Sequence, residues 1–85
     1  MTKKARTSDE KLVLALYAAA LKAGDYSTRL NRYDIGRAAG VQPKAVNSIC
    51  KLLVQANFIK KEGEEIIYLT KHGESLALRL LDERH

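Results

Sequence analysis

The chain has little cysteine and no apolar run long enough to cross a membrane. Cys50 is its one cysteine, so no disulfide can form within the chain. The longest apolar run covers ten residues, 12–21, and as a helix it would span roughly 15 Å, about half of a bilayer core. Residues 1–6 carry no signal-peptide pattern. These observations predict a cytoplasmic protein without a membrane span.

The residue patterns of enzymes and metal sites are also missing. The sequence has no nucleophile–base pair, no glycine-rich phosphate loop and no paired carboxylates. His72 and His85 lie far apart without partners at ligand spacing. We therefore expect no enzymatic activity, no metal and no cofactor. Cys50 is expected to be a small buried apolar residue; the alternative is a redox-sensing thiol, because Lys51 is adjacent.

Size and charge are more informative. A chain of 85 residues predicts one domain with a modest core. Its 15 Lys and Arg against 10 Asp and Glu give a net charge of +5. Residues 1–61 hold 12 basic and 4 acidic residues (+8), whereas residues 62–85 hold 3 basic and 6 acidic ones (−3). The basic part indicates a polyanion partner, and the alternative is an ordinary solvated surface of mixed charge.

The first helix is predicted from its capping residues. Thr7 and Glu10 have the spacing of a capping box, so a helix should begin near residue 8 and end at Gly24, a natural left-handed cap. Its apolar residues lie all round the helix, so it should be covered on more than one side. Residues 1–7 are predicted to form a flexible basic tail, and residues 8–85 a single domain.

The segment 31–59 carries two helices joined by a tight turn. Asn31 caps a short helix over about 32–39, which ends at Gly40, and Pro43 begins the next. Gly36 would let the two helices approach closely. Helical spacing places these residues inward: Ile35, Ala38 and Ala39 in the first helix, and Val46, Ile49, Leu53 and Ala56 in the second.

The rest of the chain predicts a hairpin and a last helix. Residues 58–62 and 65–69 read as two strands around Gly63, and Thr70 caps a helix after them. Residues 26–30 could add one short strand. The predicted fold is mostly α with a small β-hairpin, in the order helix, short strand, helix, helix, strand, strand, helix.

This order resembles that of the winged helix-turn-helix DNA-binding domains of small bacterial and archaeal regulators. The likeness covers about residues 8–82, and two features depart from the family pattern. Asn57 stands in place of glycine, and the tip of the wing, which is the predicted hairpin, is acidic, with Glu62, Glu64 and Glu65 around Gly63. The segments that carry the resemblance are 34–41, Val46 and Leu53, 57–59 and 68–73.

The resemblance implies sequence-specific binding of double-stranded DNA by a transcriptional regulator, with a recognition helix at about 43–56 in the major groove. The side chains expected at base edges are Gln42, Lys44, Ala45, Asn47 and Ser48. Those expected to contact phosphates are Arg29, Arg32, Lys51, Lys60 and Lys61. Asn or Gln there would suit adenine, which each can bond through two hydrogen bonds. The alternative is that these polar residues only solvate an exposed face.

Two further expectations concern partners. The surplus of apolar residues predicts a homodimer through the first and last helices, with contacts at Leu12, Leu16, Ala19, Leu76 and Leu80. The alternative is a monomer whose first helix lies beneath the others. Leu52, Val54 and the acidic wing favour a second function, a protein-interaction module without DNA binding. A DNA-binding chain would be associated with the nucleoid.

Overall fold

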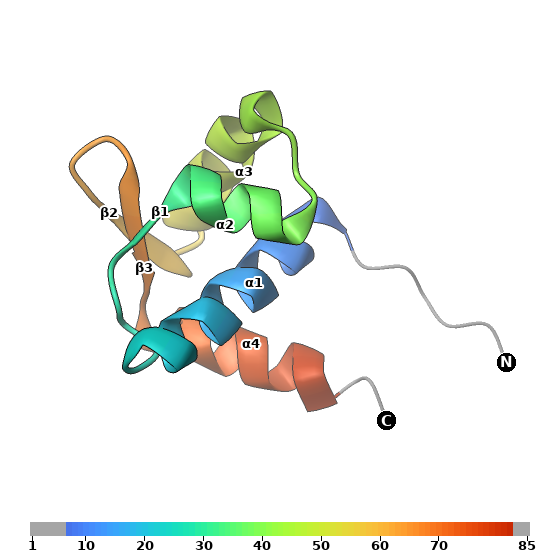
Figure 1. Cartoon of the computed structure of the whole chain (residues 1–85). Helices are drawn as coiled ribbons and strands as arrows, with labels where there is room; N and C mark the ends of the chain where they lie inside the picture. The colour runs from blue at the N-terminus through green and yellow to red at the C-terminus, as the bar shows by residue number, and fades with distance from the viewer. Residues whose placement is uncertain (1–6, 83–85) are drawn as a thin grey trace, which may run out of the picture.

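The structure, a computed structural model, describes residues 7–82. All the elements predicted from the sequence are present and in the predicted order (Figure 1). The tail predicted at residues 1–7 lies outside the described residues, apart from Thr7. The elements are α1 (Ser8–Ala23), β1 (Leu30–Asn31), α2 (Arg32–Ala39), α3 (Pro43–Gln55), β2 (Ile59–Glu62), β3 (Ile66–Leu69) and α4 (Lys71–Asp82).

The three strands form one antiparallel sheet in the order β1-β3-β2. The strand predicted at 26–30 forms only at its far end, as the two-residue β1. The residues before it are held in a turn instead. Asp25 accepts hydrogen bonds from the N–H and hydroxyl of Ser27, and the Thr28 hydroxyl bonds back to the carbonyl of Ala20. These local bonds compete with extension of the strand.

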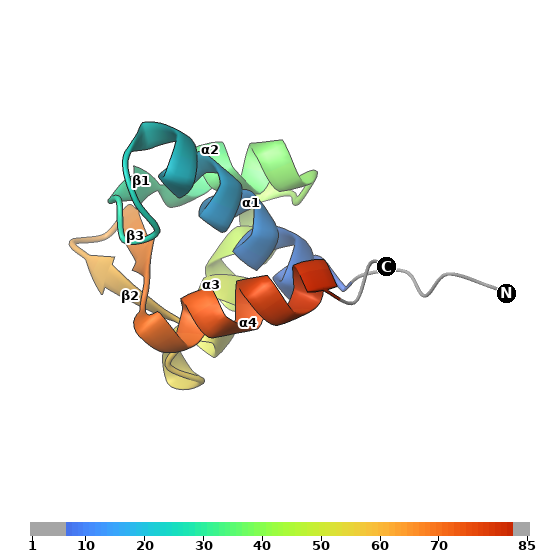
Figure 2. The same ribbon diagram turned by 90° about the horizontal axis from the view of Figure 1, so that it is seen from below.

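Helix α1 lies at the centre of the molecule. It contacts α2, α3, α4 and β3, and the two views show α2 and α4 on different sides of it (Figures 1 and 2). This surrounding explains why its apolar residues are not confined to one stripe. No helix within residues 7–82 is long and apolar enough to span a bilayer.

The dimer contacts predicted from the sequence are wrong in detail, because α1 and α4 bury them within one chain. Leu12 and Leu16 are 1% exposed and Leu80 is 3% exposed. Ala19 and Leu76 are partly buried against the same core. The large apolar residues that these two helices leave exposed are Leu21 (47%) and Leu78 (50%).

Capping explains most of the helix boundaries. The Thr7–Glu10 capping box is present, and Asn31 caps α2 through the N–H groups of its first turn. Asn57 adopts the left-handed conformation (φ 66°) in the place of the family's glycine. Gly24 ends α1 with φ 169°, so the prediction of a left-handed cap there is wrong.

Two alanines predicted to face inward are exposed. Ala38 is in the last turn of α2, a helix of eight residues whose buried positions are Ile35 and Gly36. Ala56 is the C-cap of α3, past the last helical residue, so it no longer follows the stripe that buries Leu53. The stripe predicted on α3 is otherwise confirmed by the burial of Val46, Ile49 and Leu53.

Candidate functional site

Helix α3 is held against α2 by a close approach at Gly36. A Cβ on this residue would overlap Cγ2 of Val46, so the spacing of the helices depends on the missing side chain. The turn between the helices is closed by Gly40 in the left-handed conformation (φ 75°) and by the Val41 N–H, which donates to the Gly36 carbonyl (2.8 Å). Together with Pro43 at the start of α3, these contacts fix the direction of the helix.

The exposed face of α3 carries four of the five residues predicted to face base edges. Gln42, Lys44, Asn47 and Ser48 are all exposed on its first half. Ala45 is not fully outward as predicted: it is partly buried and packs against the core. The reason is its position one turn before the buried Ile49, on the edge of the inward stripe.

Tyr33 of α2 lies beside this face, and the sequence analysis did not single it out. Its hydroxyl donates to Oδ1 of Asn47 (3.1 Å) and accepts from Nη2 of Arg32 (3.2 Å). Its ring packs against the core. The two residues joined across the helices are 14 positions apart, so no local sequence pattern indicates the bond.

A groove of about 440 Å³ lies between α3 and β2, next to the exposed face. It brings together three of the five cations predicted to contact phosphates, namely Arg32, Lys51 and Lys61. Its other lining residues are Asn47, Cys50, Val54 and Gln55. We call this the cationic groove. Three positive groups in one concave site form a surface suited to an anion.

Arg32 and Cys50 form the inner wall of the cationic groove. The Nε of Arg32 is buried and has no hydrogen-bond partner among the described residues, although Nη2 bonds to Tyr33. Burial raises the pKa of the Cys50 thiol, more than Arg32 and Lys61 lower it. Cys50 is 1% exposed, as predicted for a small apolar residue, and the raised pKa opposes a reactive thiolate.

The other two predicted cations lie on the opposite face of the sheet. Side chains alternate along a strand, so Ile59 and Lys61 share one face of β2 and Lys60 and Glu62 share the other. Ile59 is buried, and its face is the one turned toward α3. Lys60 therefore points away from the cationic groove.

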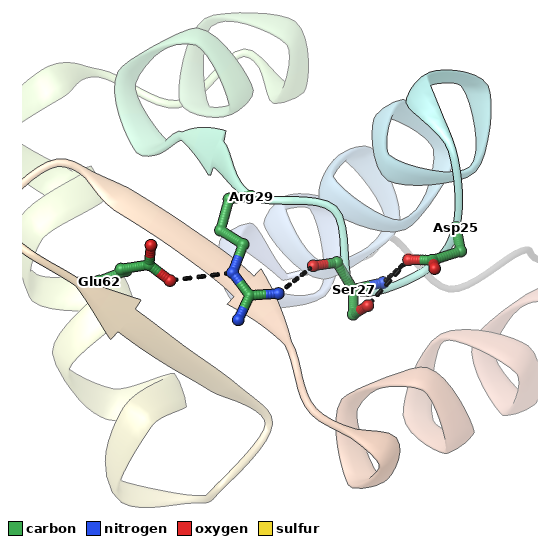
Figure 3. A network of polar contacts seen from close by, with 4 residues as sticks. All are labelled: Asp25, Ser27, Arg29 and Glu62. Carbon is green, nitrogen blue, oxygen red and sulfur yellow. Dashed lines mark hydrogen bonds and ion pairs between the residues drawn. The ribbon is translucent and has the colours of Figure 1, made fainter.

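Arg29 is engaged within the protein. Its Nε donates to Oε1 of Glu62 (2.9 Å), and Nη1 donates to the carbonyl of Ser27 (3.1 Å) (Figure 3). The guanidinium also lies 3.9 Å from the Tyr68 ring centroid. The hydrogen bond to Glu62 raises the pKa of Arg29, and hydrogen bonds from Ser27 lower the pKa of Asp25. Arg29 thus ties the loop after α1 to the wing.

The acidic wing tip is bonded to the start of α2. The carbonyl of Glu65 accepts from the Arg32 N–H (2.8 Å), and its carboxylate accepts from Nδ2 of Asn31 (3.4 Å). Glu62 is paired with Arg29. Two of the three carboxylates at the tip therefore have partners within the protein, which reduces but does not remove the negative field of the wing.

Two other features bear on function. In residues 7–82 no group of three or more His, Cys, Asp or Glu could hold a metal ion. His72 instead stacks on Phe58, with ring centroids 4.7 Å apart.

On α3, Leu52 is 61% exposed and Val54 is 37% exposed. After Pro43, the other exposed positions of this helix are polar.

Among known proteins, solved structures of winged-helix regulators share the fold of this chain. No protein-family model and no curated protein matches the sequence. A MarR-family transcriptional regulator from Silicibacter pomeroyi aligns with a TM-score of 0.70 at 19% identity, over 89% of this chain and 50% of its own. The MarR-family protein Rv2887 from Mycobacterium tuberculosis aligns with a TM-score of 0.66 at 25% identity, over 91% of this chain and 53% of its own.

A third solved structure, SSV1 F-93, aligns over nearly its whole length. It has a TM-score of 0.66 at 19% identity and covers 99% of this chain and 98% of its own. In contrast, the chain spans about half the length of the MarR-family structures that it matches. By its fold, this chain is a winged helix-turn-helix domain.

Proposed function

We propose that this chain binds double-stranded DNA in a sequence-specific manner and acts as a transcriptional regulator in the cytoplasm, associated with the nucleoid. Helix α3 would enter the major groove, with Gln42, Lys44, Asn47 and Ser48 facing base edges. The observation that carries the proposal is that Asn47, one of these four exposed residues, also lines the cationic groove. Base-reading groups and phosphate-neutralising groups would then act on one stretch of duplex.

We retain three of the five phosphate contacts that the sequence predicts. Arg32, Lys51 and Lys61 share the cationic groove. The sugar-phosphate backbone at the edge of the major groove could pass there, between α3 and the wing. Arg29 is paired with Glu62, and Lys60 lies on the other face of β2. The carboxylates of the wing tip repel phosphate, so α3 rather than the wing would carry the recognition.

A second candidate function is a protein-interaction module. It is favoured by the exposure of Leu52 (61%) and Val54 (37%) on α3, which contact with DNA does not require. An interaction through these apolar residues would be weakly dependent on salt, whereas binding through the cationic groove would be strongly dependent on it. Salt dependence therefore separates the two functions.

The test is a fluorescence-anisotropy titration of labelled duplexes selected from a random library. Three phosphate contacts per chain predict a loss of affinity of about 40-fold between about 50 and about 200 mM salt. Asn47→Ala should reduce the preference for the selected duplex over a random one, whereas Ser75→Ala, at an exposed position on α4, should not. Equal binding of both duplexes by the unmodified protein, or no binding, would refute sequence-specific recognition.

We also propose that two copies pair through α1 and α4, using the exposed Leu21 and Leu78 in place of the buried leucines predicted first. A two-fold dimer would bind half-sites about 34–36 Å apart. Light scattering at micromolar concentration should give two chains per particle, and Leu78→Glu should give one without loss of helical circular dichroism. One chain per particle for the unmodified protein would remove this proposal.

A further inference from the structure

A relay of hydrogen bonds runs from Arg32 through Tyr33 to Asn47. Nη2 of Arg32 donates to the Tyr33 hydroxyl (3.2 Å), which in turn donates to Oδ1 of Asn47 (3.1 Å). The tyrosine is well fixed at its other end. Its backbone N–H donates to Oδ1 of Asn31 (2.8 Å), and its ring packs against the core. The relay thus starts from a rigid part of α2 and ends on the exposed face of α3.

In the structure, the relay places the oxygen of the Asn47 amide against Tyr33. A phenol has one hydrogen to donate, and here Oδ1 of Asn47 receives it, while the Arg32 N–H occupies a lone pair of the same hydroxyl. The amide oxygen is therefore turned toward α2. Its NH₂ group carries two donors and no acceptor, and it is the end of the side chain that a ligand on the exposed face of α3 would contact.

We infer that Tyr33 is a specificity-determining positioning residue, an inference that rests on the proposed function. With its oxygen held by Tyr33, Asn47 presents donors to the major groove. Two donors match guanine, which presents two acceptors (O6 and N7), better than adenine, which presents one acceptor (N7) beside its N6 amino donor. Pairing with adenine through two hydrogen bonds needs the amide oxygen and nitrogen side by side toward the base, and would break the bond to Tyr33. The relay thus favours guanine over adenine at this position.

The experiment is a binding assay in which each base pair of a selected duplex is changed one at a time. The unmodified protein should prefer guanine over adenine at one position. Tyr33→Phe removes the hydroxyl and leaves the ring in place, so this preference should fall by about two- to tenfold, the range for one neutral hydrogen bond. The preferences at other positions and the salt dependence should not change.

Matched variants isolate the effect of the hydroxyl. Tyr26→Phe removes the same group from the loop after α1, where the ring faces Lys71 of α4, and should change no base preference. Asn47→Asp keeps an acceptor for the Tyr33 hydroxyl and loses the two donors, so it should abolish the preference even with Tyr33 intact. Tyr33→Phe should have no further effect on base preference in an Asn47→Ala background.

The outcomes distinguish this inference from the proposed function. Absence of salt-dependent duplex binding by the unmodified protein would refute the proposed function, and the role of Asn47 with it. Sequence-specific binding with a base profile that Tyr33→Phe leaves unchanged would refute the inference alone. A profile that changes equally with and without Asn47 would also refute it, because Tyr33 would then act through the packing of α2. Thermal unfolding of each variant confirms that folded protein is compared.

Discussion

Replacing Gly73 with alanine is expected to destabilise the domain by about 3 kcal/mol or more. Gly73 lies in the first turn of α4, where a Cβ would overlap the carbonyl oxygen of Phe58 and lie 2.9 Å from its carbonyl carbon and 2.8 Å from Cδ2 of Leu69. The Phe58 carbonyl cannot move away easily, because it accepts the N–H of Thr70 (3.1 Å). Helix α4 would have to shift off the sheet.

Denaturant unfolding followed by circular dichroism measures this loss. A domain of this size has a free energy of unfolding of about 4–13 kcal/mol, so the variant should unfold at a much lower denaturant concentration. Gly63→Ala is the matched control: its φ is 79° and nothing lies within 4 Å of the added Cβ, so only backbone strain of about 1 kcal/mol is expected. A loss at Gly73 no larger than at Gly63 would mean that α4 does not pack as described.

The helix boundaries were predictable because they depend on neighbouring residues. The capping box of Thr7 and Glu10, the cap at Asn31 and the turn from Gly40 to Pro43 all involve residues within a few positions of one another. Such bonds form in the same way whatever the rest of the chain does. The fold order followed from these boundaries.

Which helix faces are buried within the chain was less predictable, since burial depends on how the helices and strands pack together. The sequence shows that α1 is apolar all round, but this pattern suits a central helix as well as a dimer seam. Leu12, Leu16 and Leu80 were assigned to a partner and belong to the core. The contacts of α1 with α2, α3, α4 and β3 show that it is a central helix. These contacts join residues distant in sequence, so no local pattern indicates them.

The candidate site also has features that the sequence predicts and features that it does not. Helical spacing places Asn47 and Lys51 on one face of α3, so their proximity was predictable. The ion pair between Arg29 and Glu62 was not predictable, because it joins residues 33 positions apart. One signal was overlooked: alternation along β2 puts the buried Ile59 and Lys61 on the same face, which separates Lys61 from Lys60.

This separation leads to the prediction with the largest effect on binding. Replacing Lys51 and Lys61 together with alanine should weaken the binding of every duplex by about 60-fold per bound chain at about 0.1 M salt, because each lost phosphate contact forfeits the release of about 0.9 counterion. A plot of log affinity against log salt concentration should become shallower by about 1.8 per bound chain. The measurement is the anisotropy titration over a range of salt concentrations.

Lys60 provides the matched control, because Lys60→Ala and Lys61→Ala change the same charge at adjacent positions of one exposed strand. If the protein bound DNA only through its general positive charge, the two substitutions would reduce the salt slope equally. The cationic groove predicts inequality: Lys61 lines it with Arg32 and Lys51, and Lys60 does not. Lys61→Ala should lower the slope by about 0.9, and Lys60→Ala by less than about 0.3. Equal effects would exclude the groove as the path of the DNA backbone, while leaving recognition by α3 intact.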